Sequence, residues 1–242
     1  MDDLIKRCGE LRRRSEERGV LTHTPFLSPA EQYELKNAYF LPLFCGGCEN
    51  AERQMAFFLP DYMDSAYFDP SEFINAVKIT AKFSNLSHRD YLGSLMGLGI
   101  TRESIGDIIV GGETAYLFCQ SSVSSFIELN LEKAGRYGVR AQIVSLSDVP
   151  EREIKKKEVS FSVMSPRLDA VVGGMFSLSR TSASDFIREG LVTLNYTPCI
   201  KVDREVKCGD IISVRGKGKG EISEFGGQSR RGRTFIKGQI YI

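Results

Sequence analysis

The chain has 242 residues, of which 42% are hydrophobic and 26% are charged, and its formal net charge is +1. This composition is ordinary for a folded protein, and the length allows two or three small domains. No run of 18 apolar residues occurs, so we expect no membrane span. The charged N-terminus lacks the apolar core of a signal peptide, so we expect a cytoplasmic protein.

The cysteines offer one close pair, Cys45-Gly-Gly-Cys48. A structural zinc site needs four ligands, usually from a second pair of cysteines or histidines. His23 and His88 are not spaced as such a pair. We therefore expect no metal and no cofactor, and we interpret the motif as a Gly-Gly turn flanked by thiols rather than as a metal or redox site.

The first predicted segment, residues 1–75, is an α/β module. Apolar residues at helical spacing predict one helix near the N-terminus. Ser28 and Glu31 have the spacing of a capping box, which predicts a second helix that runs to about Phe40. Two short strands are expected on either side of Gly46-Gly47.

The second predicted segment, residues 76–163, is a β-α-β-β-α-β domain that ends in a linker. This order of elements fits a ferredoxin-like, RRM-type fold. Tyr116 and Phe118 lie on the third predicted strand, but the Lys/Arg-Gly-Phe-Gly pattern of an RNA-binding RRM strand is missing. A structural role for the two rings is therefore favoured over base stacking. The mixed charge run 151–158 is interpreted as a linker or as an edge strand of the next domain.

The third predicted segment, residues 164–242, is basic. It carries 13 Lys/Arg against 8 Asp/Glu, whereas the rest of the chain carries 19 against 23. A basic C-terminal third on an acidic body favours a polyanionic partner for that third.

Two helices are predicted to open this basic segment. The first, at 168–176, is strongly amphipathic. The second begins after Ser179 as N-cap and ends at Gly190. Its outward row is cationic and hydroxylic, which suits phosphates and 2′-hydroxyls, and consists of Arg180, Thr181, Ser184 and Arg188.

Strands and two basic loops are predicted to follow the helices. Gly216–Gly220 places Lys217 and Lys219 on a flexible, bulk-free backbone. A later loop carries Arg230, Arg231 and Arg233. We expect the strands between the loops to bring the second loop near the first, so that both contact phosphates.

Five short pieces of the basic segment resemble the RNA-binding domain first described in small-subunit ribosomal protein S-four, and their order and spacing match over about fifty residues. The pieces are Arg167-Leu-Asp, Leu178-Ser-Arg180, Ile187-Arg-Glu-Gly190, Val192-Thr-Leu-Asn195 and Gly209-Asp-Ile-Ile-Ser-Val-Arg-Gly216. The resemblance implies that structured RNA lies on the two helices and the loop that follows them.

The resemblance also implies which positions face RNA. The matching positions are Arg180, Thr181, Ser184, Arg188 and Asn195, to which we add Arg167, Arg215 and the five loop cations. The chain departs from the family at Tyr196, where a glycine is usual. A rebuilt turn is favoured there over a ring that stacks on a nucleotide.

Three further pieces resemble the bacterial YlmH family, whose members end in such a domain. They are Gly46-Gly-Cys-Glu-Asn-Ala-Glu-Arg53, His88-Arg-Asp-Tyr-Leu-Gly-Ser-Leu-Met-Gly-Leu-Gly-Ile100 and Ile105-Gly-Asp-Ile108. The resemblance covers nearly the whole chain. It implies binding to ribosomal RNA and tRNA on the large ribosomal subunit, in the rescue of stalled translation. Because members are often encoded beside cell-division genes, a cell-division adaptor stays an alternative.

Two motifs look catalytic. His88-Arg89-Asp90 copies the kinase catalytic triplet, but Leu95 stands where the magnesium-binding Asn should be, so a helix start is expected. Arg167-Leu168-Asp169 resembles the catalytic segment of pseudouridine synthases without their Thr-Ser-Gly, so a charged first helical turn is expected. We predict a non-catalytic RNA-binding protein with no small-molecule substrate, and an RNA-modifying enzyme is the second alternative.

Overall fold

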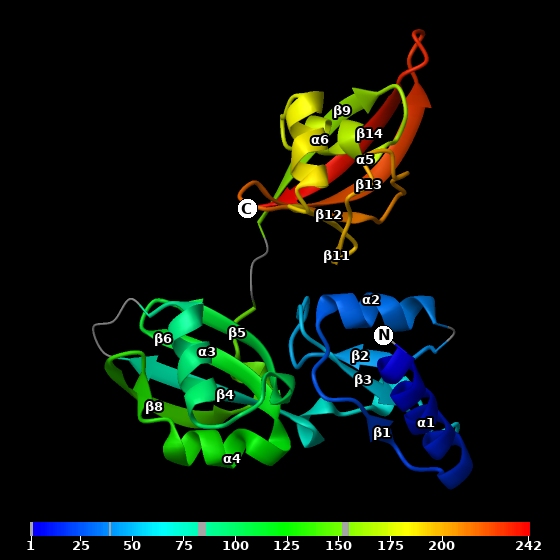
Figure 1. Cartoon of the computed structure of the whole chain (residues 1–242). Coiled ribbons are helices and arrows are strands. Elements are labelled where there is room, and N and C mark those ends of the chain that lie inside the picture. Colours follow the sequence, from blue (N-terminus) through cyan, green and yellow to red (C-terminus); the bar gives the residue numbers. More distant parts are fainter. Residues whose placement is uncertain (1, 39, 82–85, 152–154) are drawn as a thin grey trace. The chain divides into compact units, whose positions relative to one another are not determined.

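The computed structural model describes residues 2–38, 40–81, 86–151 and 155–242. The fold is mixed α+β with three antiparallel sheets, and the mixture of helices and strands that the sequence predicted is confirmed. The chain divides into two compact units, Met1–Arg152 and Glu153–Ile242 (Figure 1). Within the described ranges, none of the helices combines the length and the apolar character needed to span a membrane.

The first unit holds two of the sheets. Its helices and strands are α1 (Asp2–Arg18), β1 (Thr22–His23), α2 (Pro29–Asn37), β2 (Leu43–Cys45), β3 (Met55–Phe58), β4 (Ile74–Ala81), α3 (His88–Gly97), β5 (Ile105–Gly111), β6 (Thr114–Gln120), α4 (Ser121–Asn130), β7 (Lys133–Ala134) and β8 (Tyr137–Val144), with short 3₁₀ turns at Ser65–Tyr67, Pro70–Glu72, Arg102–Ser104 and Leu146–Asp148.

The small sheet has the strand order β1-β3-β2 and packs with α1 and α2. The predicted capping box of α2 is confirmed. Ser28 N donates to Glu31 Oε2 at 2.7 Å, and Glu31 N donates to Ser28 Oγ at 3.4 Å. The helix ends at Asn37, three residues before the predicted end.

The larger sheet has the strand order β5-β6-β4-β8-β7, and every pairing is antiparallel. The chain order β4-α3-β5-β6-α4-β8 is the predicted β-α-β-β-α-β order, with the two-residue strand β7 added before β8. Asp90 accepts hydrogen bonds from the backbone N–H and the hydroxyl of Ser87, at 2.8 and 2.7 Å. Those bonds hold the pKa of the Asp90 carboxyl below its usual value. His88-Arg89-Asp90 therefore starts helix α3, as predicted.

The two sheets of the first unit share a core. Phe118 of β6 and Ile74 of β4 pack with Phe26, Met55 and Phe57 from the N-terminal part of the chain. Backbone N–H groups of residues 52 and 53 also donate to the Asp107 carboxylate, at 2.7 and 3.1 Å. The boundary predicted between residues 75 and 76 falls inside β4, and the residues on both sides of it belong to one compact unit.

The second unit is a six-stranded sheet with two helices. Its elements are β9 (Lys156–Val163), α5 (Leu168–Met175), α6 (Arg180–Arg188), β10 (Val192–Leu194), β11 (Thr197–Pro198), β12 (Ile211–Val214), β13 (Gly218–Gln228) and β14 (Thr234–Tyr241). The strand order is β11-β10-β12-β13-β14-β9.

Strand β9 is the edge of this sheet and pairs with β14 along its whole length. The charge run 151–158 was expected to be a linker or an edge strand, and residues 156–158 are edge strand; residues 152–154 lie outside the described residues. Helix α5 packs so closely on the sheet that a Cβ on Gly220 would lie 2.5 Å from Met175 Sδ. A Cβ on Gly174 of α5 would lie 2.3 Å from the Phe161 ring, so glycine is required on both sides of the contact.

Candidate nucleic-acid interface

Helix α6 presents the predicted polar row to solvent. Ser179 caps the helix by accepting from Ser182 N at 3.0 Å. Ala183 and Ile187 are fully buried beneath it. On the other side Arg180, Thr181 and Arg188 are exposed, and Ser184 is half-buried and donates to the Arg180 carbonyl at 2.9 Å. The amphipathic pattern thus leaves a cationic and hydroxylic face on α6.

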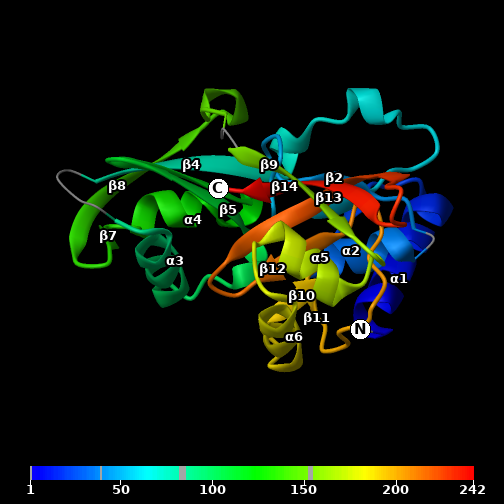
Figure 2. The ribbon, with the colours of Figure 1, turned by 90° about the horizontal axis from the view of Figure 1, so that it is seen from above.

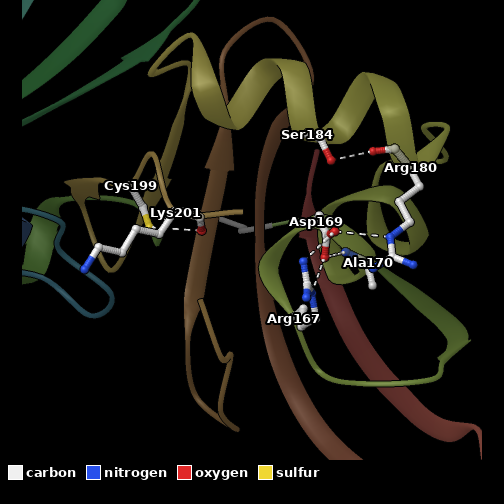
Figure 3. A network of polar contacts seen from close by, with 7 residues as sticks. All are labelled: Arg167, Asp169, Ala170, Arg180, Ser184, Cys199 and Lys201. Carbon is white, nitrogen blue, oxygen red and sulfur yellow. Dashed lines mark hydrogen bonds and ion pairs between the residues drawn. The ribbon is translucent and has the colours of Figure 1, made fainter. Parts of the chain in front are cut away.

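Asp169 lies between two of the predicted RNA-binding arginines (Figure 3). Its Oδ1 accepts from Arg167 Nε at 3.2 Å and its Oδ2 from Arg180 Nε at 3.1 Å. The Asp169 side chain is only 5% exposed, whereas those of Arg167 and Arg180 are 37% and 66% exposed. A buried carboxylate therefore anchors two guanidinium groups that still reach the surface.

The balance of forces on Asp169 favours its charged form. Burial acts to raise the pKa of this carboxyl, but hydrogen bonds and charge from Arg167 and Arg180 together outweigh burial, and the pKa lies below its usual value. Asp169 is ionised at neutral pH and fixes both arginines. The sequence predicted only a charged first turn at this position, and no local pattern revealed that residues 169 and 180 would meet.

A groove of about 380 Å³ adjoins this cluster. It is lined by Asp169 and Arg180 and, from a distant part of the chain, by Ser162 of β9 and Arg233. Arg233 donates from Nε to Ser162 Oγ at 3.0 Å and from its terminal nitrogen to the Ser162 carbonyl. The structure thus brings two predicted RNA-binding arginines, Arg180 and Arg233, to one concave surface.

The turn between β10 and β11 consists of Asn195 and Tyr196, since Leu194 pairs with Thr197. Asn195 has φ +49° and Tyr196 has φ +66°, the positive values of a type I′ hairpin turn. The sequence favoured a rebuilt turn at this place. Tyr196 lies in the left-handed region, which a glycine would adopt without strain.

The Asn195 side chain, predicted to face RNA, is buried and holds the loop that precedes β12. Its Oδ1 accepts from Ile211 N at 2.9 Å and its Nδ2 donates to Asp210 Oδ1 at 2.8 Å. Asp210 also accepts from Lys207 N at 2.7 Å. Asn195 therefore ties the β10–β11 turn to the start of β12.

Exchange of each turn residue for glycine should separate these two roles. Tyr196→Gly relieves a left-handed conformation that costs roughly 1–2 kcal/mol in a residue other than glycine. The lost contacts of the ring offset part of this gain, so we expect the free energy of unfolding of the second unit to rise by up to about 1 kcal/mol. Asn195→Gly removes two buried hydrogen bonds and should lower it by ~1–2 kcal/mol. Urea denaturation monitored by hydrogen exchange would measure both changes in stability. A lower stability of the Tyr196→Gly variant would contradict the proposal that Tyr196 is strained in the turn.

The two predicted basic loops lie at opposite ends of β13, so the expectation that they meet is wrong. Arg215–Lys217 form the β12–β13 turn, and Ser229–Arg233 form the β13–β14 loop, which projects from the other end of the sheet (Figure 1). Strand β13 has 11 residues, which at about 3.3 Å per residue separates its ends by roughly 30 Å. Moreover, Gly218–Gly220 belong to the strand and not to a flexible loop.

The loop cations differ in exposure. Arg215, Lys217, Arg230, Arg231 and Arg233 are exposed. Lys219 is half-buried, and its Nζ lies 4.7 Å from the centre of the Tyr241 ring and 6.0 Å from that of Tyr196. Four of the five loop cations predicted to bind phosphate are therefore open to solvent.

The thiols of the Gly-Gly turn lie in a partly buried apolar setting. Cys45 and Cys48 pack against the core that the two sheets of the first unit share. Burial raises the pKa of the Cys45 thiol, which a backbone hydrogen bond from Gly47 only partly opposes. Across the described ranges, no group of three or more His, Cys, Asp or Glu side chains is placed to hold a metal ion.

Part of the chain matches a known protein family, and nearly the whole chain is similar to a known protein. Residues 71–148 match a family described as "Putative RNA-binding domain in YlmH". The chain is 29% identical over 236 residues to "Ribosome-associated protein quality control protein P2" of Bacillus subtilis (strain 168), which covers 96% of this chain and 92% of that protein. It is also similar to a solved structure described as "Cell division protein ylmH from Streptococcus pneumoniae", with a TM-score of 0.49 and 24% identity over 61% of this chain and 92% of that chain. Residues 71–148 thus match the putative RNA-binding domain of the YlmH family, and the similarity to the Bacillus subtilis protein extends over nearly the whole chain.

Proposed function

We propose that this protein binds structured RNA on the ribosome without catalysing a reaction, and that it acts in the rescue or quality control of stalled translation. Ribosomal RNA and tRNA on the large subunit are the proposed ligands. The observation that carries the proposal is the similarity over 96% of the chain to a ribosome-associated quality control protein. The cationic surface around α6 supports it from the geometry of the second unit.

The second unit is proposed to be an S-four-like RNA-binding domain, and the larger sheet of the first unit a ferredoxin-like domain. Two helices on an antiparallel sheet, with the polar face of α6 outward, support the first assignment. The strand order β5-β6-β4-β8 with α3 and α4 on one face supports the second. In chain order those strands are the second, third, first and fourth, an order in which all neighbours are antiparallel.

The arginine cluster suits phosphate binding because it is already ordered. Arg180 uses Nε for Asp169, and among the hydrogen bonds of the described residues its terminal nitrogens donate none. Those nitrogens can form a two-pronged contact with a phosphate, for which guanidinium is the best-matched side chain. Because Asp169 holds the side chain in place, little rotamer entropy is lost when RNA binds.

A paired substitution on α6 tests the proposal while sparing Asp169. Thr181→Glu with Arg188→Glu introduces repulsion toward phosphate at two exposed positions. The new carboxylate at residue 181 lies in the first helical turn, where the helix dipole favours it, so the fold should persist. We expect ribosome co-sedimentation to weaken by at least about tenfold, since one phosphate contact is lost and repulsion is added.

The control variant carries the same change of net charge on another part of the chain. Arg13→Glu with Arg14→Gln alters two exposed residues of α1 and should co-sediment like the parent. Equal loss in both variants would mean that only overall charge matters. A folded α6 variant that still pelleted with ribosomes would remove α6 from the interface, and chemical modification of ribosomal RNA by the pure protein would overturn the non-catalytic assignment.

A further inference from the structure

The larger sheet of the first unit has one face covered by helices and one that is open at one end. Helices α3 and α4 lie on the same side (Figure 2), where Val77 and Leu117 are fully buried. On the other side Ala76, Phe118 and Val144 pack against the N-terminal part of the chain. Beyond Phe118, Ala76 and Val144, the N-terminal part of the chain no longer covers the sheet. The next residues along β6, β4 and β8 on this face are partly or fully exposed to solvent.

Two rows of paired residues cross this open end. Across β6, β4 and β8 they are Tyr116–Lys78–Gln142 and Thr114–Thr80–Arg140. Tyr116 and Lys78 are half-buried, while Arg140 and Gln142 are exposed. The rows thus present one aromatic ring, two cations and three uncharged polar groups, and no carboxylate.

A hollow of about 560 Å³ lies on this surface, over β4 and β8. It is lined by Lys78, Thr80, Gly138, Val139, Arg140 and Gln142. Its volume falls within the range of small-ligand pockets, so it is large enough for a nucleotide. Among the ion pairs and hydrogen bonds of the described residues, none involves the charged group of Lys78 or Arg140, so both charges lack an internal counterion there.

We propose that this open face, defined by Lys78, Thr80, Tyr116, Arg140 and Gln142, binds unpaired RNA. The sequence favoured a structural role for Tyr116 and Phe118, but only Phe118 is buried, and the Tyr116 ring is partly open on this face. In the proposed complex a base stacks on the Tyr116 ring, phosphates contact Lys78 and Arg140, and the Gln142 amide bonds to a base edge. Lys78 and Arg140 are diagonal neighbours on paired strands, roughly 7–8 Å apart at Cα, so one strand of nucleotides reaches both.

The surface chemistry favours unpaired RNA over the other ligands. A single ring on an open sheet can stack only on a base that is not already stacked within a duplex. A protein partner would call for a larger apolar centre than one tyrosine among cations. The inference rests on the proposed function and deepens it. Residues 71–148 match a putative RNA-binding domain, and the inference names the face of that domain and the class of RNA that it takes.

The test uses the full-length protein and a fluorescein-labelled oligouridine of about twelve nucleotides, which forms no duplex. Tyr116→Ala should weaken binding in fluorescence anisotropy by roughly tenfold, through loss of base stacking. Tyr116→Phe keeps the ring and should bind within about twofold of the parent. Lys78→Gln with Arg140→Gln should lower the salt slope by about 1.4, at ~0.7 per phosphate of a single strand.

Matched control variants test whether the loss of any exposed ring, or of any two cations, would weaken binding in the same way. Tyr67→Ala removes a ring that is 86% exposed outside this face, and Arg13→Gln with Arg14→Gln removes two cations of α1. Both should bind oligouridine like the parent. If Tyr116→Ala proves unstable, ultraviolet crosslinking of oligouridine to the parent protein, mapped by mass spectrometry, should identify Tyr116 or its β6 neighbours.

The outcomes separate this inference from the proposed function. Unchanged oligouridine affinity and slope in both face variants, with crosslinks elsewhere, would overturn the face while leaving ribosome binding through α6 intact. Weaker ribosome co-sedimentation of Tyr116→Ala with unchanged oligouridine binding would mean a protein contact and would also overturn it. Loss of oligouridine binding with ribosome binding absent even in the parent would support the face and defeat the ribosomal proposal.

Discussion

Asp169→Asn is expected to lower the free energy of unfolding of the second unit by about 1–3 kcal/mol. Removal of one partner of a fully buried ion pair costs about 3–5 kcal/mol. Here the two arginines are 37% and 66% exposed, so water can solvate them once the carboxylate is gone, and the cost is smaller. The amide that replaces the carboxylate keeps one acceptor oxygen, but its NH2 group faces guanidinium donors that offer it no acceptor.

Asp185→Asn is the matched control for this prediction. Asp185 pairs with Arg188 at 3.6 Å, but both side chains are more than half exposed, so its loss should change stability by less than about 0.5 kcal/mol. Hydrogen exchange followed by mass spectrometry on peptides from residues 164–190 would report the second unit by itself. Equal small effects of the two substitutions would show that Asp169 does not anchor the arginines.

The stabilisation that the ionised Asp169 carboxylate provides should depend on pH. Because the folded-state pKa of Asp169 lies below its unfolded value, the stabilisation is fully present above the unfolded pKa of about 3.9. It is lost as the pH falls through the lower, folded-state pKa. The difference in stability between the parent and Asp169→Asn should therefore be constant near neutral pH and shrink below about pH 4. A difference that disappeared already at pH 6 would assign the effect to another group.

Local sequence patterns predicted what depends on neighbouring residues. The Ser28 and Glu31 spacing predicted a capping box because both partners lie within one helical turn. The polar row of α6 followed from helical periodicity, which needs no knowledge of the rest of the fold. The order of elements around β4 was also readable, because strand and helix periodicities alternate along that segment.

Contacts between distant residues could not be read from local patterns. Arg233 and Ser162 are 71 residues apart and meet only because β14 pairs with β9. The Gly-Lys-Gly-Lys-Gly pattern suggested a flexible loop, yet Gly220 is a strand residue that leaves room for Met175 of α5. Strand β13 therefore begins at Gly218 and runs for 11 residues, which separates the basic loops.

Separate neutralisation of the two basic loops is expected to weaken binding of a long RNA helix by different amounts. Replacement of Arg230, Arg231 and Arg233 by glutamine removes up to three phosphate contacts. At ~0.7–0.9 per contact, the slope of log affinity against log salt should fall by about 2–3, which at 0.1 M salt corresponds to a loss on the order of 10²-fold. Replacement of Arg215 and Lys217 by glutamine removes up to two contacts and should lower the slope by about 1.4–1.8.

The length of the RNA distinguishes two independent phosphate sites from a single basic surface. The loops are roughly 30 Å apart along β13, and an RNA helix rises roughly 3 Å per base pair, so a stem of about five pairs spans one loop only. With such a stem, neutralisation of whichever loop is not engaged should leave the slope unchanged, whereas a stem of about fourteen pairs should respond to both variants. Electrophoretic titrations of both stems over 50–300 mM salt would measure this. If the salt slope for the short stem fell in both variants, both loops would have to contact the same short stem. The separation of the loops along β13 would then not hold in the complex.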